Sequence, residues 1–127
     1  MNVQKISGFA AILLALAVIL GAFAAHALSS RFGEYELKIW EKASFYHFTH
    51  SLGLFIVCIL FSLQLLGESQ FKVVTALMIF GILVFSGSLY ALAFTGIKLL
   101  GAITPFGGTA LILSWLYLGF SLLKKSH

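Results

Sequence analysis

Charged residues are scarce in this chain. Asp, Glu, Lys and Arg together make 9% of its 127 residues, whereas hydrophobic residues make 61%. A soluble domain carries roughly 25% charged residues. A chain this short also has too little interior to keep so much apolar surface away from water. The composition therefore excludes a water-soluble domain and predicts that lipid surrounds most of the chain.

Thiols and acids are scarce as well, and each shortage excludes a class of function. The only cysteine, Cys58, can form no intramolecular disulfide and has no partner for a thiolate metal site. None of the four acidic residues lies inside an apolar run, which argues against a transporter that needs an intramembrane carboxylate. The eight bases are scattered between the apolar runs, so no basic stripe predicts a nucleic-acid partner.

What the chain does have is a series of four long apolar runs. A membrane-spanning helix needs about 20 apolar residues at about 1.5 Å rise per residue. Runs of this length are too long for the strands of a membrane barrel. We therefore predict an all-α integral membrane protein, a single domain over 1–127 that folds as an up-down-up-down four-helix bundle. Its predicted spans are residues 6–28, 43–66, 71–94 and 105–123.

The segment between the first two runs has a different character. Residues 31–42 place apolar side chains on one helical face and alternate Glu with Lys or Arg on another. Trp40 is typical of the lipid headgroup level. We expect a short amphipathic helix lying in the membrane interface, with a solvated connector as the alternative.

Turn-forming and helix-capping residues predict the remaining helix boundaries. Residues 67–70 form a polar turn, and Thr104 followed by Pro105 predicts an N-cap and the first position of the fourth helix. The first run ends in a sequence that also fits a signal-peptide cleavage site. We expect this run to be retained, because it continues beyond the usual length of a signal-peptide apolar segment.

Small residues recur at every fourth position in two of the spans. One ridge consists of Ala17, Gly21, Ala25 and Ser29, and a second of Gly87, Ala91 and Thr95. Small side chains let two helices approach closely in lipid, where the hydrophobic effect between helices is absent. We expect both ridges to be helix-packing faces.

Polar side chains gather at one end of the predicted bundle. The topology brings the end of the first span, the start of the second, the end of the third and the start of the fourth to one membrane face. Intramembrane polar groups are costly unless they face protein or water, so this cluster is the candidate binding site. Its members are His26, Tyr46, His47, His50, Ser86, Ser88, Tyr90 and Thr104.

Two interpretations of the cluster stay open. His47 and His50 are spaced i, i+3, and His26 is expected at a comparable depth, so three imidazoles could bind a divalent metal ion such as Zn²⁺. Two of them could also hold a haem iron. Alternatively, the histidines hydrogen-bond to hydroxyls or carbonyls of neighbouring helices and hold the bundle together. Nucleophilic catalysis has no orienting acid at a defensible position apart from Glu41.

Four motifs in order also resemble a known family. They are the stretches 21–28 (GAFAAHAL), 46–52 (YHFTHSL), 85–90 (FSGSLY) and 103–108 (ITPFGG). They are similar to the small multi-pass membrane proteins that include bacterial YgdD-like and YwdK-like proteins and eukaryotic transmembrane protein 256. The resemblance covers nearly the whole chain. It implies a retained first helix and four spans, and it supplies no catalytic residues.

These observations favour a non-enzymatic membrane protein. We expect the polar cluster to fix helix packing or to dock a partner or lipid, without a cofactor. The alternative is a metal- or cofactor-binding membrane enzyme that uses His26, His47 and His50. The expected partners are membrane lipid and a second copy of the chain or another membrane protein. The expected location is the cell membrane, with both termini in the cytoplasm.

Overall fold

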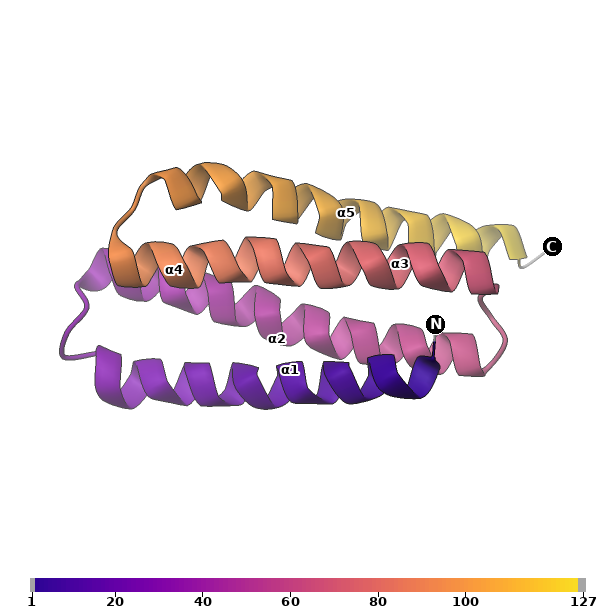
Figure 1. Cartoon of the computed structure of the whole chain (residues 1–127), viewed down its shortest axis with the longest axis horizontal. Coiled ribbons are helices and arrows are strands. Elements are labelled where there is room, and N and C mark those ends of the chain that lie inside the picture. The colour runs from indigo at the N-terminus through magenta and orange to yellow at the C-terminus, as the bar shows by residue number, and fades with distance from the viewer. Residues whose placement is uncertain (1, 126–127) are drawn as a thin grey trace.

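The computed structural model describes residues 2–125, which form helices joined by short turns. The four helical segments alternate in direction, and both termini lie at one end of the molecule (Figure 1). The predicted all-α, up-down-up-down architecture is confirmed. The elements in chain order are α1 (Val3–Phe23), the π-helical η1 (Ala24–Leu28), α2 (Glu34–Ser62), α3 (Glu68–Gly81), the π-helical η2 (Ile82–Ser86), α4 (Gly87–Thr95) and α5 (Leu99–Lys125).

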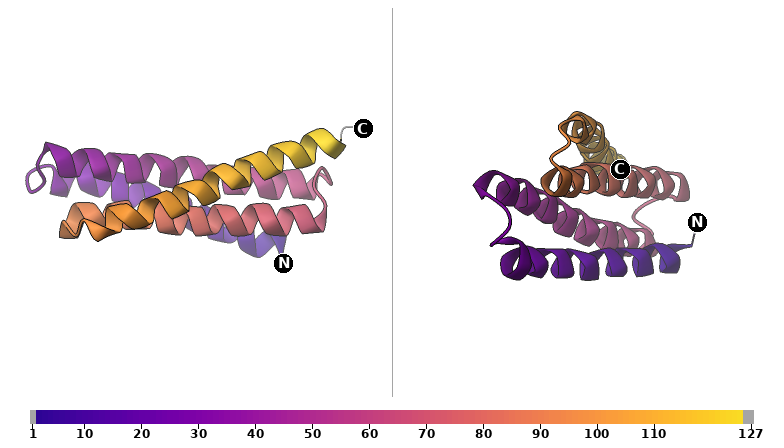
Figure 2. Two further views of the ribbon diagram at one scale, coloured as in Figure 1. Left: turned by 90° about the horizontal axis from the view of Figure 1, so that it is seen from above. Right: turned by 60° about the vertical axis from the view of Figure 1, so that its left-hand side comes forward.

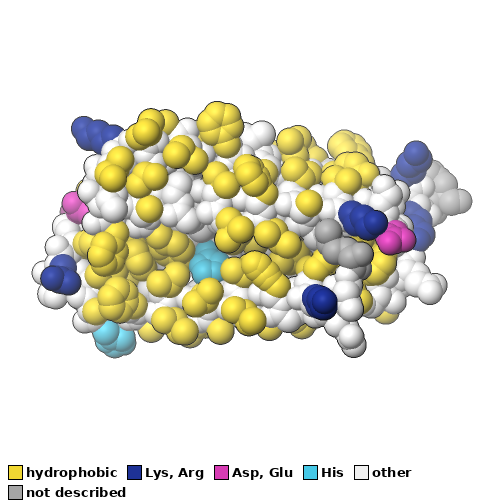
Figure 3. All heavy atoms as spheres, viewed as in Figure 1, with side chains coloured by type: hydrophobic (Ala, Val, Ile, Leu, Met, Phe, Trp, Pro, Cys, Tyr) yellow, Lys and Arg dark blue, Asp and Glu magenta, His cyan; other side chains and the backbone are white. Residues whose placement is uncertain are grey.

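Each of the four segments is long and apolar enough to cross a membrane. They comprise Val3–Leu28, Glu34–Ser62, Glu68–Thr95 and Leu99–Lys125, with 26 to 29 residues each. Helices of this length measure about 40 Å, more than the roughly 30 Å hydrocarbon core. Figure 3 shows charged side chains at the two ends of the visible face and hydrophobic side chains between them. This distribution is typical of a protein that spans a bilayer.

The helices pack in the order of the chain. α1 lies on α2, α2 lies on α3, η2 and α4, and α5 lies on the outer side of that third segment. Figure 2 shows α1 and α5 on opposite sides of the bundle. Within residues 2–125, the backbones of α1 and α5 do not come into contact. The bundle is therefore an open stack of neighbours, and each helix keeps a broad face for lipid.

A single aliphatic core runs through the middle of the stack towards the termini. It combines residues of all four segments, including Leu13, Leu54, Val74, Met78 and Leu111, each at most 6% exposed. A smaller cluster lies at the opposite end, where Ala24, Leu28, Trp40 and Ala93 pack together. The turns that join the segments are short at both ends. Gly96 allows one of them, because its φ of 73° is a left-handed conformation that suits glycine.

The expected interfacial helix is not a separate element. α2 begins at Glu34 and continues without a break through Ser62, so residues 34–42 are the first turns of the second span. No glycine or proline interrupts this stretch before Gly53, and nothing in the sequence therefore stops the helix. Trp40 also differs from the expectation of an interfacial anchor, since its side chain is 4% exposed and points into the bundle.

The predicted start of the fourth span is wrong. α5 begins at Leu99, and Pro105 lies inside the helix. Thr104 is not an N-cap; its hydroxyl donates to the carbonyl of Leu100 at 3.1 Å in the preceding turn. Proline at this position leaves the carbonyl of Gly101 without its usual intrahelical donor. The turn before α3 also lies earlier than expected, because α3 already begins at Glu68.

The small-residue ridges do not pack as expected. In the first ridge only Ala17 is buried, and in the second Gly87 and Thr95 are exposed. The π-helical turn η2 explains the second case, because a wider turn accommodates one more residue and shifts the register of everything after it. In α1 the buried residues are Ile6, Ala10, Leu13 and Ala17, so the buried stripe shares only Ala17 with the ridge.

Two other glycines make the closest helix contact. Gly107 of α5 lies against η2, where a Cβ atom would overlap the backbone nitrogen of Phe85 and lie 2.8 Å from its Cα. A Cβ on Gly81 would lie 3.1 Å from the carbonyl oxygen of Gly107. The absence of side chains at these two positions therefore sets the separation of α5 from the third segment.

Candidate functional site

Hydrogen bonds between helices concentrate at the end of the bundle opposite the termini. The hydroxyl of Tyr90 on α4 lies 2.9 Å from Nδ1 of His47 on α2 and donates to Oγ of Ser44 at 3.2 Å. Ser86 of η2 donates to the carbonyl of Ala43 at 2.8 Å. These contacts join the second and third spans side chain by side chain.

The same level of the bundle also ties in the outer two spans. The indole nitrogen of Trp40 donates to the carbonyl of Leu20 on α1 at 3.0 Å. The hydroxyls of Ser88 on α4 and Thr104 on α5 lie 2.6 Å apart. All four spans are thus connected by polar contacts at one end. We call these residues the interhelical polar cluster: Trp40, Ser44, His47, Ser86, Ser88, Tyr90 and Thr104.

Aromatic rings fill the space around this cluster. The ring of Trp40 meets Tyr90 edge-on with centroids 4.6 Å apart, and Phe32 meets Phe94 edge-on at 5.8 Å. Edge-to-face pairs add to the energy of simple burial. The rings also exclude lipid and water from the hydrogen bonds, which strengthens them.

His50 and Tyr46 belong to the surroundings of the cluster and not to its hydrogen bonds. Nδ1 of His50 lies 2.9 Å from the carbonyl of Tyr46, one turn earlier in its own helix. Its ring packs edge-on against Trp115 of α5, with centroids 5.8 Å apart. Tyr46 is 37% exposed and packs against Phe85. Both residues serve as packing contacts between α2 and its neighbours.

The three imidazoles of the metal hypothesis do not come together. His26 is exposed on η1, whereas His47 and His50 are buried and contact different helices. Figure 3 shows histidine atoms at well-separated places on the visible face. Across residues 2–125, no three His, Cys, Asp or Glu side chains are grouped so that they could hold a metal ion. The described geometry therefore lacks the convergence that such a site requires.

Two buried polar atoms near the cluster have no hydrogen-bond partner among the described residues. They are Nε2 of His47 and Oγ of Ser51, one helical turn apart on α2. The side chains are 4% and 0% exposed. The backbone of Leu13 on α1 faces His47, so Ser51 is the clearer unsatisfied group, and such a group lowers stability.

A groove opens to the outside of the cluster between α2, α4 and α5. Its volume is about 400 Å³. Lys42 lies at its charged end, Tyr46, Phe85 and Leu89 provide an apolar wall, and Thr104 belongs to both the groove and the cluster. The complete lining is Lys42, Tyr46, Phe85, Leu89, Gly101, Thr104 and Pro105. We call it the α2–α5 groove.

Comparison with known proteins places the chain in a family. The model of the family described as "Protein of unknown function (DUF423)" matches residues 20–108, which include every member of the polar cluster. The chain belongs to the DUF423 family. The match covers all of α2, the third segment and the start of α5.

Several DUF423 relatives are similar over most of their length. The UPF0382 membrane protein YwdK of Bacillus subtilis is 45% identical over 86% of this chain and 88% of its own. A UPF0382 membrane protein of Staphylococcus epidermidis is 43% identical over 86% and 87%. One from Staphylococcus saprophyticus is 45% identical over 81% and 83%. The expected resemblance to YwdK-like multi-pass membrane proteins is confirmed, and no solved structure matches the chain.

Two residues of the interhelical polar cluster were not predicted from the sequence. Ser44 is absent from the cluster that the sequence predicts, and Trp40 was predicted as an interfacial anchor. A signal for both was present: each lies on the stripe of α2 that also contains Ala43 and His47, at helical spacing. A continuous helix from Glu34 would have predicted that this stripe faces the bundle.

Proposed function

We propose that this protein is a non-enzymatic, lipid-binding membrane bundle. In this proposal the interhelical polar cluster holds the four spans in place, and the α2–α5 groove receives one phospholipid. The observation that carries the proposal is the pairing of the cluster's polar groups across helices. Groups already engaged in interhelical hydrogen bonds stabilise the bundle, and the groove beside them opens towards the lipid.

The chemistry of the α2–α5 groove fits a phospholipid better than a soluble metabolite. Lys42 offers a cation at the level where a lipid phosphate lies. Below it the walls formed by Tyr46, Phe85 and Leu89 suit an acyl chain. Gly101, whose carbonyl lacks an intrahelical donor because of Pro105, can accept a hydrogen bond from a headgroup hydroxyl or ammonium.

The lipid half of the proposal is tested by filling the groove. The expected effect of Gly101→Leu is loss of co-purified phospholipid, measured by native mass spectrometry of the full chain. Gly101 lines the groove, and a Cβ there would make only ordinary contact with Leu92 at 3.6 Å, so the substitution is compatible with the fold. Gly119→Leu is the matched control, because it lies on the same helix with open space around it. Equal lipid retention by the two variants would contradict the proposal.

The structural half is tested at the histidines. His47→Ala and His50→Ala should lower the melting temperature in detergent while the metal content, measured by elemental analysis, stays the same as in the wild type. Unaltered melting would count against a structural role. Loss of a stoichiometric metal in either variant would favour the alternative of a metal-dependent enzyme.

We also infer that both termini lie in the cytoplasm. Each end of the bundle has four bases, but the end with the termini has one acid, Glu68, and the other end has three. The count of bases is equal at the two ends, so the positive-inside rule does not decide, and the inference rests on the distribution of the acids alone. Alkaline phosphatase fused to the C-terminus should be inactive in cells, because it folds only outside the cytoplasm. An active fusion would reverse the orientation.

A further inference from the structure

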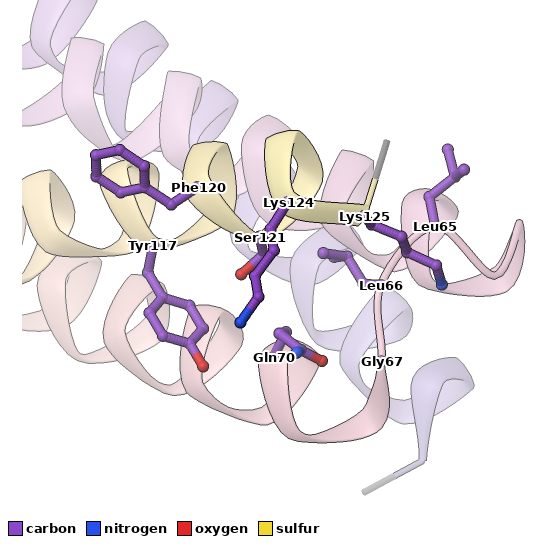
Figure 4. A pocket seen from close by; sticks show the side chains of 9 residues that line it. All are labelled: Leu65, Leu66, Gly67, Gln70, Tyr117, Phe120, Ser121, Lys124 and Lys125. Atoms are coloured by element: carbon purple, nitrogen blue, oxygen red, sulfur yellow. The ribbon is translucent and has the colours of Figure 1, made fainter. Parts of the chain in front are cut away.

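A second groove lies at the other end of the bundle, far from the polar cluster. It is formed by the last turns of α5, the first turn of α3 and the turn that connects α2 to α3. Its volume is about 480 Å³. Figure 4 shows its lining: Leu65, Leu66, Gly67, Gln70, Tyr117, Phe120, Ser121, Lys124 and Lys125. We call it the terminal groove.

Hydrogen-bond donors face one another inside the terminal groove. In Figure 4 the ammonium group of Lys124 extends between the hydroxyl of Tyr117 and the amide of Gln70. Ser121 lies one turn beyond Tyr117 on the same helix. An ammonium, a phenol and an amide that converge on one space form a site for a small anion that carries hydroxyl groups.

The two lysines have different tasks in this arrangement. Lys125 donates from Nζ to the carbonyl of Gln64 at 2.5 Å. Gln64 has a positive φ of 61° within the connecting turn, so this bond holds a turn of unusual conformation against α5. The ion pairs found in residues 2–125 are Glu34–Lys38 and Glu68–Lys72. Within that range the charge of Lys124 is thus not matched by a carboxylate and is available to a ligand.

The apolar residues beside the groove indicate what kind of ligand carries the anion. Phe120 is 68% exposed and Leu65 is 45% exposed, and Figure 4 shows both side chains directed away from the polar centre. Phe120 lies on α5 one turn further into the span than Lys124, where acyl chains begin, whereas Leu65 lies in the turn after α2. The site therefore offers charge at headgroup level and apolar surface next to it, which matches an amphipathic anion.

We propose that the terminal groove binds the headgroup of an anionic phospholipid of the phosphatidylglycerol type. The phosphate lies against Lys124 and the hydroxyl of Tyr117, and the glycerol hydroxyls lie against Gln70 and Ser121. The acyl chains run along Phe120. This site is in the leaflet opposite to the α2–α5 groove, so neither site requires the other.

The test uses the full chain in nanodiscs that contain phosphatidylcholine with graded fractions of phosphatidylglycerol. Native mass spectrometry counts the phosphatidylglycerol molecules that stay bound after release from the nanodisc. Lys124→Gln should weaken retention about fivefold, the effect of one lysine on an anionic membrane. Tyr117→Phe should weaken it by a smaller factor. Lys98→Gln, at the opposite end of the bundle, is the matched control and should retain as much as the wild type.

Three outcomes would overturn the proposal. Equal losses in Lys124→Gln and Lys98→Gln would mean general attraction to a charged surface. Equal retention of phosphatidylcholine and phosphatidylglycerol would mean that the headgroup is not recognised. Displacement of the lipid by millimolar inorganic phosphate would identify a free-phosphate site. Lys124→Gln and Lys98→Gln replace exposed side chains, and a melting curve of each variant checks that it is folded. The Gly101→Leu variant should keep this lipid, which separates failure here from failure of the α2–α5 groove.

Discussion

The two ends of the bundle are held together by different forces. At the end opposite the termini, hydrogen bonds and aromatic edges connect all four spans. In the middle and towards the termini, apolar side chains dominate, with one buried interhelical bond from Ser114 to the carbonyl of Val74 at 2.9 Å. The contact of Gly107 with Phe85 lies next to the polar end, because Phe85 precedes Ser86 and Gly107 follows Thr104 by about one turn. In lipid the hydrophobic effect does not drive helices together, so close packing and hydrogen bonds remain. The comparison shows both of these means in one small protein, with the hydrogen bonds more numerous at one end.

The largest expected effect concerns the close packing of α5 against η2. Gly107→Ala places a methyl group where the backbone nitrogen of Phe85 lies, and backbone atoms cannot move aside without separating α5 from η2. We expect a loss of about 3 kcal/mol, the upper range for overpacking, measured by unfolding in sodium dodecyl sulfate followed by circular dichroism.

Gly87→Ala is the matched control for this packing variant. A Cβ at Gly87 meets nothing within 4 Å, and alanine is favoured over glycine inside a helix by about 0.5–1 kcal/mol. We therefore expect the control to be neutral or slightly stabilising. If Gly107→Ala behaves like its control, the close contact does not set the packing of α5 against η2.

The next largest effect concerns the hydrogen bonds of the interhelical polar cluster. Tyr90→Phe keeps the ring against Trp40 but removes the hydroxyl that joins His47 and Ser44. Two interhelical bonds at about 0.6 kcal/mol each predict a loss of about 1 kcal/mol. Tyr35→Phe, at a position that is 69% exposed, is the control in the same unfolding assay. A loss close to that of Gly107→Ala would mean that the hydrogen bonds of Tyr90 stabilise the bundle as much as the close contact of Gly107 does.

The smallest effect compares two buried serines. Ser86→Ala removes a bond to the carbonyl of Ala43 and should cost about 0.6 kcal/mol. Ser51→Ala removes a buried hydroxyl without a partner in the described part of the chain, so the variant should be neutral or more stable. Opposite signs in these two variants would sharpen the comparison. A clear loss in Ser51→Ala would instead point to a bond with bound water.

Of the two interpretations left open for the polar cluster, the hydrogen bond of His47 with the hydroxyl of Tyr90 on a neighbouring helix agrees with the structural one. His47, Tyr90, Ser86, Ser88 and Thr104 do meet at one end of the bundle. Their pairing could not be read from the sequence, because hydrogen-bond partners depend on the rotation of each helix about its own axis. The π-helical turn η2 changes that rotation after Ile82. His26 was placed near the others by depth alone, and its side chain lies outside the bundle.

The starts of α2 and α5 also could not be predicted from local sequence preferences. Pro105 and residues 31–42 were interpreted by preferences that hold for isolated helices. In the folded chain, α5 starts six residues before its proline, at Leu99, and α2 absorbs the amphipathic stretch. Both helices gain packing against neighbours by being longer, and this gain outweighs a local stop signal.

The sequence alone determined that lipid surrounds the chain, that it has four spans and that successive helices run in opposite directions. Those properties follow from hydropathy summed along the chain, and such a sum needs no knowledge of neighbours. Only the tertiary structure decided which polar groups pair, where Trp40 points and which glycines let helices touch. The hydrogen-bonded partners in the cluster are 16 to 46 residues apart in the chain. Their meeting depends on the depth and rotation of two helices at once, which only mutual packing sets.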